Sequence, residues 1–276
     1  MTELHEVVAQ REFAYSRRDF DRVRRLLFER AGIRLADSKD AMVYSRLARR
    51  LRILKLTRFK DYLEMVAHNH QEQEHFVNAL TTNLTSFFRE PHHFEALSTY
   101  LKQHPNTKRI WCSASSTGEE PYSIAMTVAS VFGTFTPPVT IVATDIDSRV
   151  LQKAAAGIYS ANGIEQLPHH YRQQFFYKGK GAQLGKVRVA DELRRMVQFE
   201  TLNLMSPTWD IESPIDIIFC RNVMIYFDRD TQRKILSRMV KLMTPEGMYV
   251  AGHSENFTMY PELVRPMGKT IYRPVN

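Results

Sequence analysis

A strand, a loop and a helix in direct succession constrain the fold of this chain more than any other segment. Residues 109–112 form a short apolar run typical of a buried strand, and an apolar helical repeat begins at Pro121. The loop between them consists of small residues with one glycine, Gly118, and two acids, Glu119 and Glu120. Such a unit presents backbone N–H groups and a helix N-terminus to a ligand. The segment therefore predicts an α/β fold with a ligand site at the end of this strand.

The two acids indicate which ligand suits the loop. A phosphate-binding loop is normally rich in glycine and often adds a lysine, whereas Glu119 and Glu120 would repel an anion. Carboxylates suit a ligand that carries hydroxyls and positive charge. S-adenosylmethionine, with its ammonium, its sulfonium and its ribose, is the cofactor that fits.

A second strand supports the same cofactor. Residues 139–144 are apolar and rich in β-branched side chains, and Asp145 and Asp147 follow them, with Ser148 as the expected N-cap of the next helix. An acid at the end of the second strand of a doubly wound sheet binds ribose hydroxyls. We therefore expect Asp145 to bind the ribose; the alternative is that Asp145 or Asp147 only caps the helix.

The chain before residue 82 carries apolar stripes at helical spacing and almost no strand signal. The first stripe includes Phe20, Val23 and Leu27 and ends at Gly32. This pattern predicts a small helical bundle. Three arginines beside the second stripe are expected to face away from it: Arg46, Arg49 and Arg50.

The rest of the chain alternates strands and helices, which is typical of a parallel sheet with covered faces. One stretch, about residues 172–199, departs from this alternation: glycine turns separate short alternating segments, the last of them Val197-Gln198-Phe199. It predicts an inserted antiparallel subdomain, after which the core strands resume at Thr201. Residues 248–252 and 270–272 are expected to be the closing strands.

Charge and cysteine content limit the remaining possibilities. Sixteen bases but only six acids lie between Arg11 and Lys60, so the net charge of +8 is concentrated in the helical region. Two cysteines, both at expected strand ends, argue against a disulfide framework. No run is long and apolar enough to span a bilayer, and residues 1–6 lack the pattern of a secretory signal. The histidine pairs, His92/His93 among them, are expected at surface or capping positions, and no metal site is predicted.

Four motifs in the chain resemble those of the CheR-type chemotaxis receptor methyltransferases. In chain order they are NLTSFFRE (83–90), TGEEPYS (117–123), CRNVMIYF (220–227) and GHSEN (252–256). The resemblance runs from the basic helices to the last strand. It implies a class I S-adenosylmethionine-dependent methyltransferase fold, Rossmann-like, with a mostly parallel sheet, a C-terminal antiparallel hairpin, an N-terminal helical bundle and the inserted β-subdomain. The implied divisions are a docking domain (1–82), a junction (83–92) and a catalytic domain (93–276).

The resemblance also implies the reaction. Members transfer the methyl group of S-adenosylmethionine to the side-chain carboxylate of glutamates on chemoreceptors, which leaves S-adenosylhomocysteine and a methyl ester. A glutamate is already ionised at neutral pH, so no general base is needed and positioning is the main task. The implied protein is a cytoplasmic monomer that is recruited to membrane-embedded receptor arrays without inserting into the membrane.

Two side chains are expected to orient the accepting carboxylate. Arg89 offers a planar fork that matches a carboxylate, and Tyr226 adds a neutral donor. The structural alternatives are an interdomain salt bridge for Arg89 and a core position for Tyr226. His253 and Glu255 are left open between a structural and a functional role. By resemblance the cofactor contacts are Asn83, Thr85, Arg89, Glu120 (rather than Glu119), Asp145, Asn203, Leu204, Arg221 and Asn222, with Leu204 acting through its backbone or packing on adenine.

The basic region allows three interpretations: a solvated face, a nucleic-acid contact or a contact to acidic protein. The helices lack the interleaved aromatics of a single-strand-binding surface, and Glu-rich receptor helices are complementary to an arginine-rich face. We therefore expect chemoreceptors, and no nucleic acid, as partners. The rival functions are methylation of RNA or of a small molecule, and a cofactor-binding regulator that has lost catalysis.

The β-subdomain has an implied role of its own. Members that tether to a receptor's C-terminal peptide add it as an extra strand to the edge of this subdomain. The corresponding positions here are Lys178 (where tethering members carry Arg), Gly179, Gly185 and Arg188. The loop between Gly179 and Gly185 has the full length of the tethering type, so we expect peptide tethering.

Overall fold

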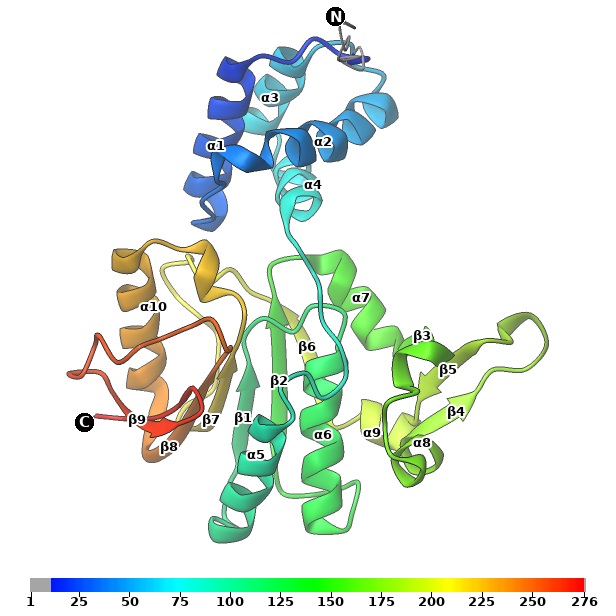
Figure 1. Ribbon diagram of the computed structural model, residues 1–276, viewed down its shortest axis with the longest axis vertical. Coiled ribbons are helices and arrows are strands. Elements are labelled where there is room, and N and C mark those ends of the chain that lie inside the picture. Colours follow the sequence, from blue (N-terminus) through cyan, green and yellow to red (C-terminus); the bar gives the residue numbers. More distant parts are fainter. Residues whose placement is uncertain (1–10, 276) are drawn as a thin grey trace, which may run out of the picture. The chain divides into compact units, whose positions relative to one another are not determined.

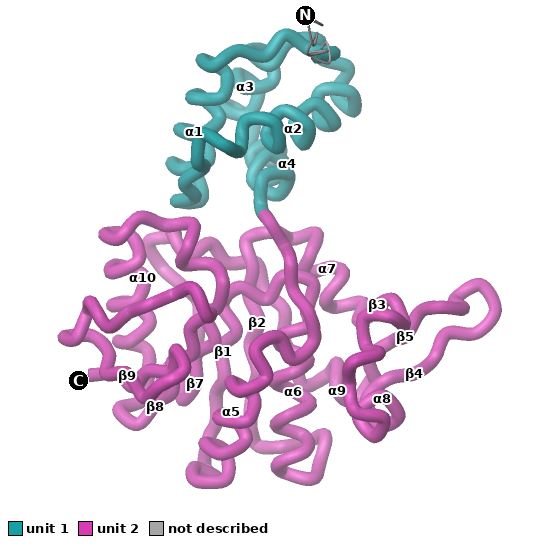
Figure 2. The backbone as a smooth tube through the Cα atoms, viewed as in Figure 1, with its two compact units in different colours: residues 1–81 teal, residues 82–276 magenta. Residues whose placement is uncertain are grey.

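The computed structural model describes residues 11–275, which form two compact units (Figure 2). The first unit ends at Thr81 and the second begins at Thr82. The predicted absence of a secretory signal in residues 1–6 lies outside the described residues. Each unit has its own core and is described by itself.

The first unit is a bundle of helices. Its elements are α1 (Arg17–Ala31), the short 3₁₀ helix η1 (Asp37–Lys39), α2 (Asp40–Leu54), α3 (Phe59–His68) and α4 (His70–Leu80). Ser16 and Asp19 form a reciprocal capping box at the start of α1, and Gly32, at φ 70°, ends it in the left-handed conformation. Phe20, Val23 and Leu27 are all buried, so the first predicted stripe is confirmed.

Two of the three arginines expected to face away from the apolar stripe of α2 contact α4. Arg50 forms two hydrogen bonds to the buried Glu72 of α4, at 2.7 and 3.0 Å. Arg46 donates to the backbone carbonyl of Thr81 at 2.7 Å, just beyond the end of α4. Their long side chains join α2 to α4, and the sequence pattern did not predict these contacts. Arg49 alone of the three is exposed.

The second unit is built on a seven-stranded sheet (Figure 1). The strand order is β6-β2-β1-β7-β8-β10-β9. Its strands are β1 (Arg109–Cys112), β2 (Thr140–Asp145), β6 (Val197–Thr201), β7 (Ile215–Cys220), β8 (Met243–Ala251), β9 (Val264–Gly268) and β10 (Ile271–Pro274). The first five strands in this order pair in parallel, and β10 pairs antiparallel with both β8 and β9. The predicted parallel sheet with a C-terminal antiparallel hairpin is confirmed.

Helices cover both faces of this sheet. They are α5 (His92–Gln103), α6 (Glu119–Phe132), α7 (Ser148–Ala156) and α10 (Arg229–Leu242). Alternate residues of each strand enter different cores: Ile110 and Phe219 pack with α5 and α6, whereas Trp111 and Cys220 pack with α10. Figure 1 shows α5 and α6 on one face of the sheet. Because both faces are covered, only the strand ends are free to form a site.

A small antiparallel sheet is inserted between β2 and β6. Its strands are β3 (Ile158–Ser160), β4 (Phe176–Lys178) and β5 (Lys186–Val189), in the order β3-β5-β4. The short elements beside them are η2 (Ala161–Ile164), α8 (His169–Phe175), η3 (Gly181–Gln183) and α9 (Asp191–Arg194).

The sequence placed the end of this insertion wrongly. Residues 197–199 were expected within it, but they belong to β6, which pairs in parallel with β2 at the edge of the main sheet. The core therefore resumes at Val197 rather than at Thr201. The insertion also begins earlier than expected, because β3, which comes before residue 172, pairs with β5 and belongs to the inserted sheet.

Over the described residues, no helix combines the length and the apolarity needed to cross a bilayer.

Candidate functional site

The loop after β1 is shaped by a glycine and by neighbouring side chains. Gly118 has φ 99° and precedes α6; a Cβ atom there would lie 2.8 Å from the side chains of Ala154 and Tyr159. The Tyr159 hydroxyl donates to the carbonyl of Thr117 at 2.7 Å. Strand β3 and helix α7 thus hold this loop against the start of α6.

Asp145, the last residue of β2, forms a hydrogen bond to the same loop. Its carboxylate accepts from the N–H of Ser116 at 2.8 Å and from the N–H of Asp147 at 3.0 Å. The residue is 8% exposed, and burial raises the pKa of its carboxyl. Each oxygen accepts one N–H and can accept a further donor. Asp145 therefore joins the ends of β1 and β2, and its proposed contact to ribose hydroxyls stays a prediction.

The helix cap after β2 differs from the expected one. Asp147 is the N-cap of α7 and accepts from the N–H of Arg149 at 3.0 Å, so Ser148 is the first helical residue. Asp147 also accepts from the side-chain amide of Asn83 at 3.3 Å. The carbonyl of Asn83 in turn accepts from Ser116 Oγ at 3.0 Å. Asn83 thus lies at the ends of β1 and β2, and Thr85, two residues on, is half-buried.

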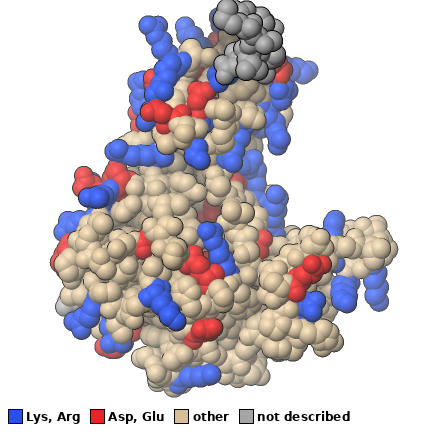
Figure 3. Space-filling model, in the orientation of Figure 1, with Lys and Arg blue, Asp and Glu red and all other residues tan. Residues whose placement is uncertain are grey.

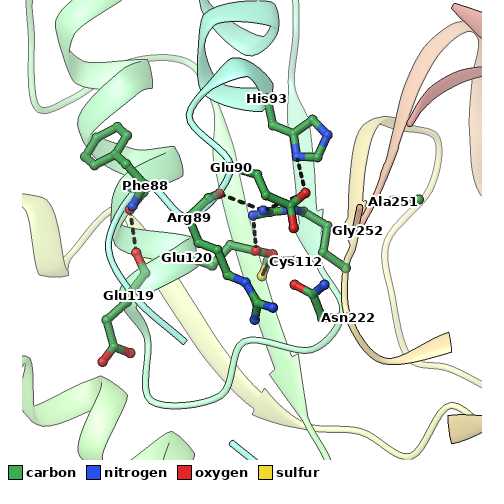
Figure 4. A network of polar contacts seen from close by, with 12 residues as sticks. Phe88, Arg89, Glu90, His93, Cys112, Glu119, Glu120, Asn222, Ala251 and Gly252 are labelled. Carbon is green, nitrogen blue, oxygen red and sulfur yellow. Dashed lines mark hydrogen bonds and ion pairs between the residues drawn. The ribbon is translucent and has the colours of Figure 1, made fainter. Parts of the chain in front are cut away.

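Glu119 and Glu120 lie in different surroundings (Figure 4). Glu120 pairs with Arg221 Nη1 at 2.5 Å and accepts from Cys112 Sγ at 3.3 Å. Glu119 accepts from Thr117 Oγ1 at 2.6 Å, and burial raises the pKa of its carboxyl. Figure 4 shows Glu119 pointing away from Arg89 and Glu120. Glu120, chosen from the sequence, is thus the acid on the side of Arg89.

Arg89 stands in a turn with unusual backbone geometry. Its neighbours Phe88 and Glu90 have φ 52° and 58°, values that a bulky residue rarely adopts. Three contacts stabilise the turn. The N–H of Phe88 donates to Ser123 Oγ at 2.9 Å, and the Arg89 carbonyl accepts from Arg221 Nη2 at 2.6 Å. The third is the approach of Arg221 to the Glu90 carboxylate at 3.4 Å.

The guanidinium of Arg89 has no acidic partner within the second unit as described. It donates to the carbonyl of Leu84 at 3.1 Å and is partly exposed. Most of its donors therefore remain for a ligand.

Tyr226 ends the short 3₁₀ helix η4 (Met224–Tyr226) that follows β7. Met224 and Phe227 on either side belong to the core, whereas Tyr226 is partly exposed. Within the part of the second unit that the structure describes, its hydroxyl forms no hydrogen bond. These features favour a ligand contact over a core role.

The predicted residues after β6 lie at the same edge of the sheet. Asn203 Oδ1 accepts from the N–H of Met205 at 2.9 Å. Leu204 is buried in the core beside Trp111, and Arg238 of α10 donates to the carbonyl of Ser206 at 2.8 Å. Of the two options for Leu204, this burial favours a contact through its backbone.

The guanidinium of Arg221 is fully buried and its contacts are with protein groups. Its two Nη atoms are engaged with Glu120, Glu90 and the Arg89 carbonyl, so we expect a cofactor contact of Arg221 from its backbone. The next residue, Asn222, is partly exposed at φ 58°.

The four residues predicted to bind a peptide lie on the inserted sheet and not at this site. Lys178 ends β4, the N–H of Gly179 donates to the carbonyl of Lys186 at 2.9 Å, and Gly185 has φ 80°. Arg188 in β5 pairs with Asp191 at 2.7 Å. Strand β4 is an edge strand of this sheet, as strand addition requires.

Three side chains beside the site, two of them buried and one half-buried, were missed or left open by the sequence. His93 was expected at a surface or capping position, but it is fully buried and its Nε2 lies 3.0 Å from the carbonyl of Lys269. Burial, with the nearby charge of Arg221, lowers the pKa of His93 to about 4. Glu90 and Glu255 are the other two. The motifs FFRE and GHSEN contain both acids, but neither motif shows what its acid contacts.

Glu90, His92 and His93 also form the one group of three possible metal ligands among the described residues. Their ligand atoms lie within 4.8 Å of one another. The guanidinium of Arg221, 3.4 Å from Glu90, places a fixed positive charge beside them. That charge opposes the binding of a cation.

The sheet order, with its parallel strands and C-terminal antiparallel hairpin, is that of the class I S-adenosylmethionine-dependent methyltransferase fold. Models of two family domains match the chain: "CheR methyltransferase, SAM binding domain" over residues 83–273 and "CheR methyltransferase, all-alpha domain" over residues 18–81. The chain belongs to the CheR methyltransferase family.

Curated relatives agree with this assignment. The chain is 51% identical over 271 residues to chemotaxis protein methyltransferase 2 of Pseudomonas aeruginosa, covering 97% of each chain. It is 47% identical over 261 residues to the chemotaxis protein methyltransferase of Escherichia coli strain K12, covering 94% of this chain and 91% of the relative. A probable chemotaxis protein methyltransferase of Rhizobium etli is 39% identical over 259 residues, with 90% of this chain and 96% of the relative covered.

Proposed function

We propose that this methyltransferase esterifies the side-chain carboxylate of glutamates on chemoreceptors. The observation that carries the proposal is the pair Arg89 and Tyr226, each partly exposed and without an acidic partner among the described residues of the second unit. A guanidinium fork and a neutral hydroxyl are the donors that orient a carboxylate without removing its charge. The names of the relatives, chemotaxis protein methyltransferases, support a receptor as the acceptor.

The donor groups at the sheet edge suit S-adenosylmethionine. Acids at the ends of β1 and β2 match its positive charge and its ribose hydroxyls, and no lysine lies in the loop to attract a phosphate. The proposed contacts are Asn83, Thr85, Arg89, Glu120, Asp145, Asn203 and the backbone of Leu204, Arg221 and Asn222. When bound, the cofactor supplies a methyl group that passes to the carboxylate oxygen as the carbon–sulfur bond breaks, which leaves a neutral thioether.

The protein's part in this reaction is positioning. An ionised glutamate attacks without losing a proton, so the site needs no general base. Arg89 and Tyr226 hold the carboxylate in line with the methyl group, and the strained turn around Arg89 keeps the guanidinium in place. Because opposite charges cancel during transfer, a site that displaces water also helps.

The helical unit is proposed to dock on acidic receptor helices. Several of its bases are exposed and lack an acidic partner among the described residues: Arg18, Arg25, Arg49, Lys55 and Lys60. Figure 3 shows Lys and Arg side chains over this unit, with Asp and Glu among them. The unpaired bases supply the positive field that a Glu-rich partner requires.

The inserted sheet is proposed to tether the enzyme to the C-terminal peptide of a receptor. The exposed edge of β4 and the basic side chains Lys178 and Arg188 support addition of a peptide strand that ends in a carboxylate. Calorimetric titration with receptor-tail peptides ending in an aromatic residue should release or absorb heat. A titration without heat and without spectral change would refute tethering.

The test of the reaction uses S-adenosylmethionine with a labelled methyl group. Chemoreceptor-containing membranes and RNA are offered to the enzyme in parallel, and the labelled product is treated with mild base. We expect label on a receptor band that base releases, as a carboxyl ester requires. Label in RNA, or none despite cofactor binding, would contradict the proposal.

A further inference from the structure

The carboxylate of Glu255 is surrounded by backbone N–H groups from two different loops. Its Oε1 accepts from Val223 at 3.0 Å and Met224 at 2.8 Å, and its Oε2 accepts from Asn222 at 3.0 Å and Gly252 at 2.6 Å. Three of these donors follow β7 and the fourth follows β8. The residue is 4% exposed, so water does not compete for the carboxylate.

The chain needs such an acceptor because it leaves β7 in an irregular conformation. Asn222 has φ 58°, which ends the strand ladder, and the three successive N–H groups of residues 222–224 then point toward one place. Unpaired buried N–H groups are costly, and a carboxylate with two oxygens satisfies all of them at once. The conformation of this segment therefore depends on Glu255.

Gly252 allows the two loops to approach closely. A Cβ atom at this position would lie 2.4 Å from Asn222 Nδ2 and 2.8 Å from its backbone N. Figure 4 shows Asn222 beside Gly252, with Arg89 near it. A larger residue would displace Asn222 from this place.

The charge of Glu255 is balanced by N–H dipoles. Among the described residues no lysine, arginine or histidine forms an ion pair with it. Burial raises the pKa of its carboxyl, and the four N–H donors oppose this rise because they favour the charged form. A neutral amide in the same place would turn one acceptor oxygen into a donor that faces two N–H groups.

The turn that Glu255 fixes carries Tyr226. The N–H of Tyr226 donates to the carbonyl of Val223 at 3.1 Å, so the short helix η4 begins within the segment that Glu255 binds. We propose that Glu255 is a positioning residue that fixes the loop of Asn222 and Tyr226 against the β8 loop and thereby sets the orientation of the Tyr226 hydroxyl. The catalytic part of this inference rests on the proposed role of Tyr226 in holding the accepting carboxylate.

The first variant is Glu255→Gln in the full chain, with Glu262→Gln as the matched control. Glu262 is an exposed acid that pairs with Arg233 on the surface. We expect Glu255→Gln to lower kcat between about tenfold and 100-fold, because a small misplacement of a positioned group costs that much. Because the clamped loop also carries Asn222, a proposed cofactor contact, the Kd of S-adenosylmethionine should rise as well, but by a smaller factor than the fall in kcat. The control should match the wild type.

Hydrogen exchange tests the clamp without any substrate. In Glu255→Gln, deuterium uptake should rise in residues 222–226 and 250–256 and stay unchanged in the helical unit. Unchanged uptake in both segments, or unchanged kcat in a folded variant, would overturn the proposal. If Glu255→Gln does not fold at the assay temperature, Glu255→Asp, which keeps the charge but shortens the reach, is judged by the same criteria.

A double variant separates this inference from the proposed function. If Glu255 acts through Tyr226, then Glu255→Gln combined with Tyr226→Phe should lose much less activity than the product of the two single losses. Independent, multiplying losses would contradict the positioning role. Normal turnover in Tyr226→Phe would instead remove the proposed role of the hydroxyl, and the exchange data would still decide whether Glu255 clamps the loop.

Discussion

At the scale of single residues, Arg221 connects more of the site than any sequence motif suggests. Its buried guanidinium contacts Glu120 at 2.5 Å, the Arg89 carbonyl at 2.6 Å and Glu90 at 3.4 Å. One cation thus balances two acids and holds the backbone beside the proposed substrate-binding arginine. Replacing either acid would leave this charge buried and under-compensated.

Arg89 itself is the residue with the clearest expected effect on catalysis. Arg89→Ala should lower methyl transfer by about 100-fold or more, because the accepting carboxylate loses its fork of donors. Cofactor binding should be at least partly retained, since other residues at the strand ends remain. Turnover and calorimetric cofactor binding measure the two effects separately. Arg233→Ala, at an exposed pair on α10, is the control, and unchanged turnover in Arg89→Ala would contradict the mechanism.

His93 should make stability depend on pH in a defined window. In the unfolded chain its imidazole takes up a proton below about 6.5, whereas in the folded protein its pKa is lowered to about 4 by burial and by Arg221. Between these values the unfolded state binds more protons, so the free energy of unfolding falls as the pH falls. The loss should reach about 3 kcal/mol at the acid end.

The measurement for His93 compares urea unfolding of the wild type and His93→Gln between the two pKa values. A glutamine keeps an N–H donor for the carbonyl of Lys269 but does not titrate. Its stability should therefore depend less on pH than that of the wild type. Equal pH dependence of the two proteins would show that His93 is not the group responsible.

At the scale of elements, α2 and α4 are joined by a largely buried ion pair. Glu72 of α4 accepts two hydrogen bonds from Arg50, whose side chain is 16% exposed. Glu72→Ala leaves the guanidinium uncompensated and should lower the stability of the helical unit by about 3 kcal/mol. Glu64→Ala removes an exposed pair with Arg22 and should cost less than about 1 kcal/mol. Denaturant unfolding of both variants measures the two losses of stability. Equal losses would contradict the greater contribution expected of the buried pair.

The exposed face of α2 should contribute to receptor docking. Arg49 is exposed and unpaired among the described residues, and its neighbour one turn later, Ile53, is 61% exposed. Arg49→Glu should raise the KM for receptor several-fold without changing kcat, and added salt should weaken binding of the wild type. Lys234→Glu on α10 is the matched control. An unchanged KM in Arg49→Glu would place the docking surface elsewhere.

At the scale of the whole molecule, the sequence was most informative where local pattern and burial agree. The strand–loop–helix around Gly118 and the apolar stripe of α1 were predicted because each has an unambiguous period. Strand β6 was misplaced because it is a sheet edge: its burial alternates at its start, so the pattern matches an antiparallel strand. Strand β3 has three residues, none of them buried, and is too short to show an alternating pattern.

The candidate site shows the same limit. Asp145 at a strand end and Arg89 in a motif could be proposed from the sequence, because a position or a motif marked them. The contacts of Arg221, Glu255 and His93 could not, because they join segments up to 177 residues apart in the chain. A long side chain that reaches another element leaves no periodic signal, which is also why the contacts of Arg46 and Arg50 were not predicted.

The most direct test of the account identifies the methylated atom on the receptor. A chemoreceptor is incubated with S-adenosylmethionine and either the wild type or Arg89→Ala, and its peptides are sequenced by tandem mass spectrometry. We expect methyl esters on glutamate side chains of the receptor's cytoplasmic helices with the wild type, and almost none with Arg89→Ala. Methylation of another residue type, or equal esterification by both enzymes, would contradict it.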